Sequence, residues 1–184
     1  MAVKTFITGE KLTTSDTNTY LNNGGLVYIS STTIGSGVSP VFVDGFSATY
    51  DAYKIIVSGG TASGTTYLNF RVGASTGPET GAVYQQSFLY TTLINTAAAA
   101  GNTGTAMTYA GAADGNGIAT MIDLVSPYQA GKTIIQAPAY AQGSFAGWSN
   151  CLVNTNTQYT RFYIYTNAGT MTGGTITLYG YRKA

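Results

Sequence analysis

The chain has 184 residues, a length that suits one domain with a core of its own. Only 8% of its residues are charged and its formal net charge is +1, whereas typical soluble proteins carry roughly 25% charged residues. Because nucleic-acid binding needs a dense positive surface, this composition argues against a nucleic-acid partner.

Residues 1–24 have the pattern of a leader that contains one short helix. Thr13 is a good N-cap for a helix over residues 14–22, and Asp16 faces the positive end of that helix. The segment is shorter than the roughly 12–15 residues that an isolated helix needs, so it must dock to be stable. The apolar side chains available for docking are Leu12, Tyr20 and Leu21.

Residues 25–184 are predicted to form a single β-sandwich domain. Eight to ten short strands are divided by Gly-rich turns, and no strand alternates with a helix. Alternation predicts that Leu68, Phe70 and Val72 face the core. The expected strands are 25–31, 38–43, 53–58, 65–72, 83–93, 117–125, 132–142 (interrupted by Pro138), 148–154, 159–166 and 175–182.

Alternation also sorts two later strands into faces. In the strand over 117–125, Ile118, Thr120, Ile122 and Leu124 fall together, and in the last strand Ile176, Leu178 and Gly180 do. The residues of each set are therefore expected to share one face of their strand.

Residues 95–116 are rich in Ala, Gly and Thr and contain no expected strand. Residues 97–100 have the composition of one helical turn, but the whole segment is better interpreted as a long surface loop. Because a loop of this length in a compact domain usually has a function, it is a candidate contact surface.

The fifteen tyrosines suggest a binding surface. Tyr159, Arg161, Tyr163 and Tyr165 alternate along one expected strand and would form an aromatic stripe. The stripe has three interpretations: a cross-strand ladder that stabilises the sheet, a subunit interface, or a glycan-binding face. Trp148 is interpreted as a core residue, and Cys151 as a buried structural thiol.

Catalytic chemistry is poorly represented in the chain. It contains no histidine, which excludes Ser-His and Cys-His nucleophiles and His-rich zinc sites, and its single cysteine cannot form an intrachain disulfide. Asp44 and Asp51 lie near expected turns, and Asp114-Gly-Asn116 lacks the further acids of a calcium loop. We expect no catalytic residues, no metal and no cofactor, and therefore no enzyme.

Three segments carry a resemblance to known proteins. The spacing Phe6-x-x-Gly9-x-x-Leu12-Thr13-x-x-Asp16-x-Asn18-x-Tyr20-Leu21 resembles a leader near the start of tail-fibre and other virion proteins of tailed bacteriophages, those of marine and cyanobacterial phages especially. Tyr-Lys-Ile-Ile-Val at 53–57 and the closing Gly-Thr-Ile-Thr-Leu-Tyr-Gly-Tyr-Arg resemble strands of small jelly-roll phage virion proteins. The resemblance implies a head fibre, decoration protein or tail fibre, assembled as a homo-oligomer and often as a trimer.

The expected fold is therefore all-β: an antiparallel, jelly-roll-like β-sandwich with a short N-terminal helix. The expected function is that of a non-enzymatic structural component of a bacteriophage virion. Phe6, Leu12, Thr13, Asp16, Tyr20 and Leu21 would attach it to other virion proteins. The alternatives are a carbohydrate-binding module that recognises a host surface glycan, and a glycan depolymerase with two acids in one cleft.

The expected localisation is the virion. The N-terminal Met-Ala-Val-Lys carries no signal peptide, so synthesis in the host cytoplasm is expected. No apolar run approaches the roughly 20 residues of a membrane span, so no membrane insertion is expected.

Overall fold

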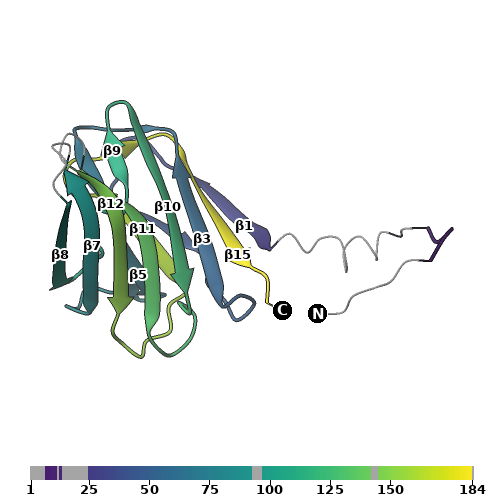
Figure 1. The fold of residues 1–184 in the computed structure, drawn as a ribbon. Helices are drawn as coiled ribbons and strands as arrows, with labels where there is room; N and C mark the ends of the chain where they lie inside the picture. The colour runs from purple at the N-terminus through teal and green to yellow at the C-terminus, as the bar shows by residue number, and fades with distance from the viewer. Residues whose placement is uncertain (1–6, 12, 14–24, 93–96, 142–144, 184) are drawn as a thin grey trace.

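The computed structural model describes residues 7–11, 13, 25–92, 97–141 and 145–183 (Figure 1). The described residues contain strands and no helix. The helix expected over 14–22 lies outside them and stays a prediction. No helix within the described part is long and apolar enough to cross a membrane.

The described chain forms an all-β, antiparallel body. Most strands lie where alternation placed them, with ends shifted by a few residues. The strands are β1 (Leu26–Thr33), β2 (Val41–Asp44), β3 (Ala52–Ser58), β4 (Thr61–Ala62), β5 (Thr66–Ala74), β6 (Gly77–Pro78), β7 (Tyr84–Thr92), β8 (Ala97–Gly104), β9 (Ala112–Asp114), β10 (Gly117–Val125), β11 (Thr133–Ala141), β12 (Phe145–Val153), β13 (Arg161–Thr166), β14 (Met171–Thr172) and β15 (Thr175–Tyr181).

Thirteen of these strands belong to one hydrogen-bonded sheet that folds into two layers. The large layer has the order β1-β15-β3-β10-β11-β12-β7-β8, and the small layer has the order β2-β13-β5-β6. Strand β9 joins the layers because it pairs with β10 and with β5. Figure 1 shows the large layer in front with β5 behind it, an arrangement consistent with a β-sandwich.

The core lies between the two layers. Leu68, Phe70 and Val72 of β5 are fully buried, as alternation predicted. The sets that alternation grouped on one face of β10 and of β15 are also buried (Ile118, Thr120, Ile122, Leu124, Ile176, Leu178 and Gly180). Buried side chains alternate with exposed ones along these strands, and burial of the inward apolar side chains is the main force that holds the layers together.

The interpretation of residues 95–116 as a surface loop was wrong. Residues 97–104 form β8, so no helical turn exists at 97–100. The chain then crosses from the large layer to the small one, where Met107 exchanges two backbone hydrogen bonds with Phe70, before β9 begins. Alanine and glycine carry little strand propensity, so backbone pairing with β7 decides the conformation here and composition does not.

Two further details of the sequence prediction change. Strand β11 is not interrupted at Pro138, which stays in register opposite Trp148 of β12. The expected strand over 159–166 begins two residues later, at Arg161, so Tyr159 precedes it.

The crossing segment is held by a buried glutamine. Gln86 of β7 points inward and is 4% exposed. Its amide oxygen accepts hydrogen bonds from the Thr108 N–H (2.9 Å) and hydroxyl (3.0 Å), and its amide nitrogen donates to the Thr108 carbonyl and to Ser149. Each side-chain polar atom of Gln86 therefore has partners, which is what a buried amide needs.

Candidate binding surface

The predicted aromatic stripe is only partly formed. Arg161, Tyr163 and Tyr165 lie on one face of β13, the face that points away from the core between the two layers. Tyr159 lies before the strand and is buried, with its hydroxyl 3.0 Å from the Thr155 hydroxyl and donating to Glu79 (3.3 Å). Tyr159 therefore has a different environment from the other three residues and is not part of an exposed surface.

The rest of the stripe is covered by cross-strand contacts. The Arg161 guanidinium lies 2.8 Å from the Asp44 carboxylate and 5.2 Å from the centre of the Phe42 ring. Arg71 lies 5.1 Å from the centre of the Tyr165 ring, and the neighbouring Tyr163 is only 8% exposed. These contacts favour the interpretation of the stripe as a ladder that stabilises the small layer.

The predicted attachment residues fall almost entirely outside the described part of the chain. Phe6, Leu12, Asp16, Tyr20 and Leu21 all lie there, and their proposed role stays a prediction. Thr13 is described and exposed.

Exposed apolar side chains gather on one surface instead: the face of the large layer that points away from the small layer, here called the outer face. The described residues include ten large hydrophobic side chains that are exposed, and eight of them lie on this face. The pairing register places them together, because directly opposed residues share a face. The eight are Leu26, Tyr28, Leu89, Met121, Val125, Ile134, Tyr140 and Trp148.

One row of this face crosses four strands. Pro138 of β11 lies opposite Trp148 of β12, which lies opposite Leu89 of β7, which lies opposite Ala99 of β8. Trp148 is 58% exposed and Leu89 is 67% exposed. The row therefore forms an apolar ridge across the outer face.

The prediction that Trp148 is a core residue was wrong. Cys151 is buried, as expected, and so are Ser149 and Val153 on the same side of β12. Trp148 has the opposite parity and must point outward. Because Cys151 was predicted to be buried, alternation along the strand would have placed Trp148, three positions earlier, on the exposed face.

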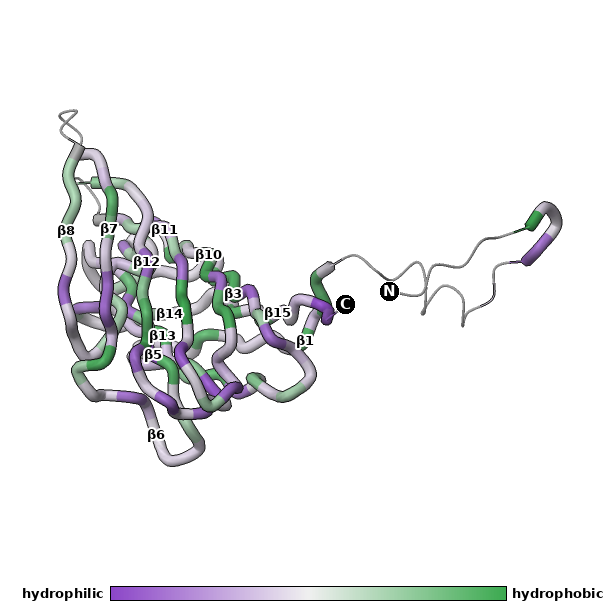
Figure 2. Tube along the Cα trace, turned by 60° about the horizontal axis from the view of Figure 1, so that its bottom comes forward, coloured by the Kyte–Doolittle hydropathy of each residue, from purple (hydrophilic) through white to green (hydrophobic). Residues whose placement is uncertain are grey.

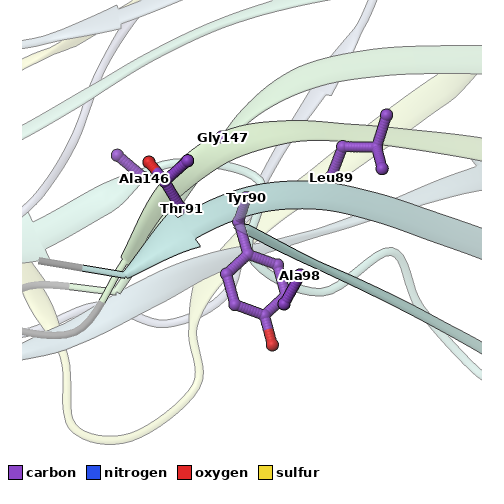
Figure 3. Close-up of a pocket in the computed structure, with 6 residues that line it drawn as sticks. All are labelled: Leu89, Tyr90, Thr91, Ala98, Ala146 and Gly147. Carbon is purple, nitrogen blue, oxygen red and sulfur yellow. The ribbon is translucent and has the colours of Figure 1, made fainter. Parts of the chain in front are cut away.

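Two shallow depressions flank the ridge. One has a volume of about 330 Å³ and is lined by Leu89, Tyr90, Thr91, Ala98, Ala146 and Gly147 (Figure 3). Figure 3 shows Leu89 on one side of the strands and Tyr90 with Ala98 on the other. The second, of about 280 Å³, is lined by Gln85, Ser87, Ile134, Asn150, Cys151 and Leu152. Both depressions are open and mostly apolar. The outer face is therefore a nearly flat surface with two shallow depressions, and neither of them is a cleft.

Charge on the outer face is almost absent. Within the described strands of the large layer, Lys54 and Asp123 are the charged residues, and they form an ion pair of 2.8 Å. The Tyr181 hydroxyl donates to the same carboxylate at 2.6 Å. Burial lowers the pKa of Lys54, but the hydrogen bonds with Asp123 and Tyr181 outweigh it and the pKa is raised. The outer face is therefore electrically neutral, and its apolar side chains stand among uncharged polar ones.

Sequence reasoning also missed a cluster of aromatic rings between the layers. Tyr67 of β5 and Tyr109 of the crossing segment have ring centres 4.0 Å apart. Phe145 lies 5.1 Å from Tyr109 and 4.6 Å from Tyr90. Burial and the neighbouring Tyr109 raise the pKa of Tyr67 to about 12. The cluster joins four segments that are distant in the sequence, and no local pattern signals it.

The groups that carry chemistry elsewhere in proteins are engaged or buried here. Burial raises the pKa of the Cys151 thiol to about 12. Asp51 lies 2.8 Å from Lys183, and Asp114 accepts hydrogen bonds from the backbone of Asn116 and Gly117, as a turn-forming aspartate does. The described residues contain no group of three or more His, Cys, Asp or Glu side chains that would hold a metal ion.

Comparison with known proteins does not assign the chain to a family. No protein-family model matches it, and no curated protein matches it. The outer face and its ridge are therefore the starting point for a function.

Proposed function

We propose that the protein is a non-enzymatic structural component of a bacteriophage particle, a fibre, knob or decoration protein, that assembles through its outer face. The observation that carries the proposal is the gathering of eight exposed large hydrophobic side chains on one neutral sheet face. Assignment to a phage particle rests on the resemblance of the leader, of residues 53–57 in β3 and of the last strand, β15, to phage virion proteins.

The size of the face suits a protein interface. Eight strands about 4.8 Å apart and about eight residues long cover roughly 900 Å². A stable interface buries about 800 Å² on each partner, so the outer face is large enough to hold one. A face of this extent with so few charges is therefore better explained by a protein partner than by permanent exposure to water.

The strand order supports a jelly roll as the scaffold. A jelly roll has eight strands in two Greek keys. The orders β1-β15-β3-β10 and β2-β13-β5-β9 would be its two four-stranded sheets. Strands β11, β12, β7 and β8 would then be additions that widen one sheet. The Trp148 ridge lies on these additions, which supports a specialised role for them.

The direct test is the mass of the native protein by light scattering after size exclusion. The ridge variant carries both Trp148→Asp and Leu89→Asp. It should convert an oligomer into a monomer, because burying unpaired carboxylates in an interface is costly. Phe42→Asp is the matched control, since Phe42 is 54% exposed on the small layer. The same mass for the wild type and the ridge variant would overturn the proposal.

A second candidate function is recognition of a neutral glycan on the host surface. It is favoured by the exposed Trp148 ring, which lies two positions along β12 from Asn150, whose amide accepts a hydrogen bond from Gln136 at 3.1 Å. An aromatic platform beside uncharged amides suits the apolar face and the hydroxyls of a sugar. Glycan-array binding that is lost in Trp148→Ala would support this candidate, and an array with no signal would oppose it.

A further inference from the structure

Strand β8 leaves one border of the large layer open. It pairs with β7 over eight residues, from Ala97 opposite Thr91 to Gly104 opposite Tyr84, with no register shift. Figures 1 and 2 both show β8 at the margin of the body. Among the described residues, no backbone hydrogen bond links β8 to any strand other than β7. Half of the residues of such a strand direct their N–H and C=O groups away from the sheet.

This edge lacks the features by which proteins protect open strands. Natural edge strands are short, bulged, or carry lysine, proline or inward-pointing charges. Residues 97–104, Ala-Ala-Ala-Ala-Gly-Asn-Thr-Gly, contain none of these residues and pair without a bulge. The opposite border, β1, has a register shift between Tyr28 and Ser30. The two borders of the layer therefore differ, and β8 is the one suited to accept another strand.

The complement of a strand edge is another strand edge, because it satisfies the outward backbone groups in a regular ladder. We propose that β8 of one chain pairs antiparallel with β8 of a second copy, so that two large layers join into one sheet. The proposal names the partner in the assembly described above and in that sense rests on it. The observation that carries it, the open edge, is independent of the outer face.

The geometry of a two-fold pair restricts the register. Residues directly opposed across an antiparallel pair share a face, and Ala99 and Gly101 lie on the outer face while Ala100 lies on the inner one. The two-fold axis must therefore pass through a residue and not between residues, with Ala100 and Gly101 at the centre of the strand as the two choices. No charged side chain lies on β8, so the pairing opposes no like charges.

Engineered cysteines test the pairing. A residue on the axis lies opposite its own copy, where Cα atoms about 4.5–5.5 Å apart fall within disulfide range. Ala100→Cys or Gly101→Cys should form a disulfide-linked dimer under mild oxidation, and Ser31→Cys on β1 is the control that should not. The natural Cys151 is buried and does not compete. Cross-linking at β8 no greater than that of Ser31→Cys would overturn the proposal.

A second variant addresses the native, uncross-linked protein. Ala100→Lys adds a charge to an exposed position of β8 on the side opposite the ridge, which should block pairing and leave both the outer face and the circular dichroism spectrum unchanged. The expected result is loss of the β8-dependent dimer. An unchanged mass would oppose the proposal. The resemblance to phage proteins implies a trimer, whereas two-fold pairing at β8 gives dimers, so the mass itself also discriminates.

Failure of this inference differs from failure of the proposed function. If the ridge variant lowers the mass but β8 cysteines do not cross-link, the outer face is the interface and the edge pairing is wrong. If β8 cysteines cross-link and the ridge variant keeps the wild-type mass, the edge pairing holds and the role of the outer face is wrong.

Discussion

Replacing Gln86 by leucine should destabilise the sandwich although the side-chain volume barely changes. The substitution removes the partners of the Thr108 N–H and carbonyl and of the Ser149 hydroxyl, while Gln86 itself is 4% exposed. An unsatisfied buried polar group costs about 1–3 kcal/mol, and half-buried Thr108 recovers part of this from water. The expected loss is therefore about 3 kcal/mol, a large share of a typical stability of about 5–15 kcal/mol.

Urea unfolding followed by circular dichroism measures this loss, and thermal melting should show a decrease of about 6–12 °C. Gln136→Leu is the matched control, because Gln136 is exposed on the outer face and donates one hydrogen bond, to Asn150 at 3.1 Å. The control should change stability by less than about 0.5 kcal/mol. If both variants lost the same small amount, the crossing segment would not depend on Gln86 and the reasoning would be refuted.

Three further predictions concern the core and its ionisable groups. Gly147→Ala should lower the free energy of unfolding by about 3 kcal/mol in the urea assay, since the new methyl group would lie against the Leu89 carbonyl and 2.6 Å from the Tyr90 Cα. The control Gly117→Ala has open space around it and should be tolerated. Cys151 has a pKa of about 12, so about one molecule in ten thousand carries the thiolate at pH 8. Alkylation of Cys151, measured by mass spectrometry, should therefore occur only as the protein unfolds. Rapid labelling of the native protein would oppose this prediction. Stability should fall as the pH rises from about 10 to 12, because an unfolded tyrosine loses its proton near 10 whereas Tyr67 keeps it to about 12. Urea midpoints at these pH values should decline less in Tyr67→Phe, and an identical decline would show that Tyr67 is not responsible.

Much of the sandwich was predictable because period-two alternation is a local property. Leu68, Phe70 and Val72 of β5 were assigned correctly to the core, and the sets grouped on β10 and β15, with residues such as Ile122 and Leu178, do share a buried face. Such a pattern survives folding because a one-residue slip would expose every apolar side chain of the strand.

The parts that sequence reasoning missed depend on pairing between distant segments. Strand β8 has the composition of a loop, and only its partner β7 makes it a strand. The outer face is assembled from residues of several strands. Trp148 was predicted to be a core residue, but it lies three positions from buried Cys151 and therefore on the opposite side of β12. The stripe on β13 was located correctly for Arg161, Tyr163 and Tyr165, but Tyr159 lies before the strand.

In the jelly-roll interpretation the ridge and the open edge lie on the four added strands, whereas the outer face as a whole extends over all eight strands of the large layer. The ridge crosses β11, β12, β7 and β8, and β8 is also the open edge. The ridge and the open edge therefore lie away from β3 and β15, the strands that resemble phage proteins.

Trp148 is the single tryptophan of the chain, so its fluorescence reports on the outer face directly. Acrylamide quenching should be measured over a dilution series of the wild-type protein, with Leu89→Asp as the variant that disrupts the ridge. Assembly through the outer face predicts that Trp148 is shielded at high concentration and becomes accessible on dilution, and that it stays accessible in Leu89→Asp. Quenching that is unaffected by concentration and equal in both proteins would contradict the account.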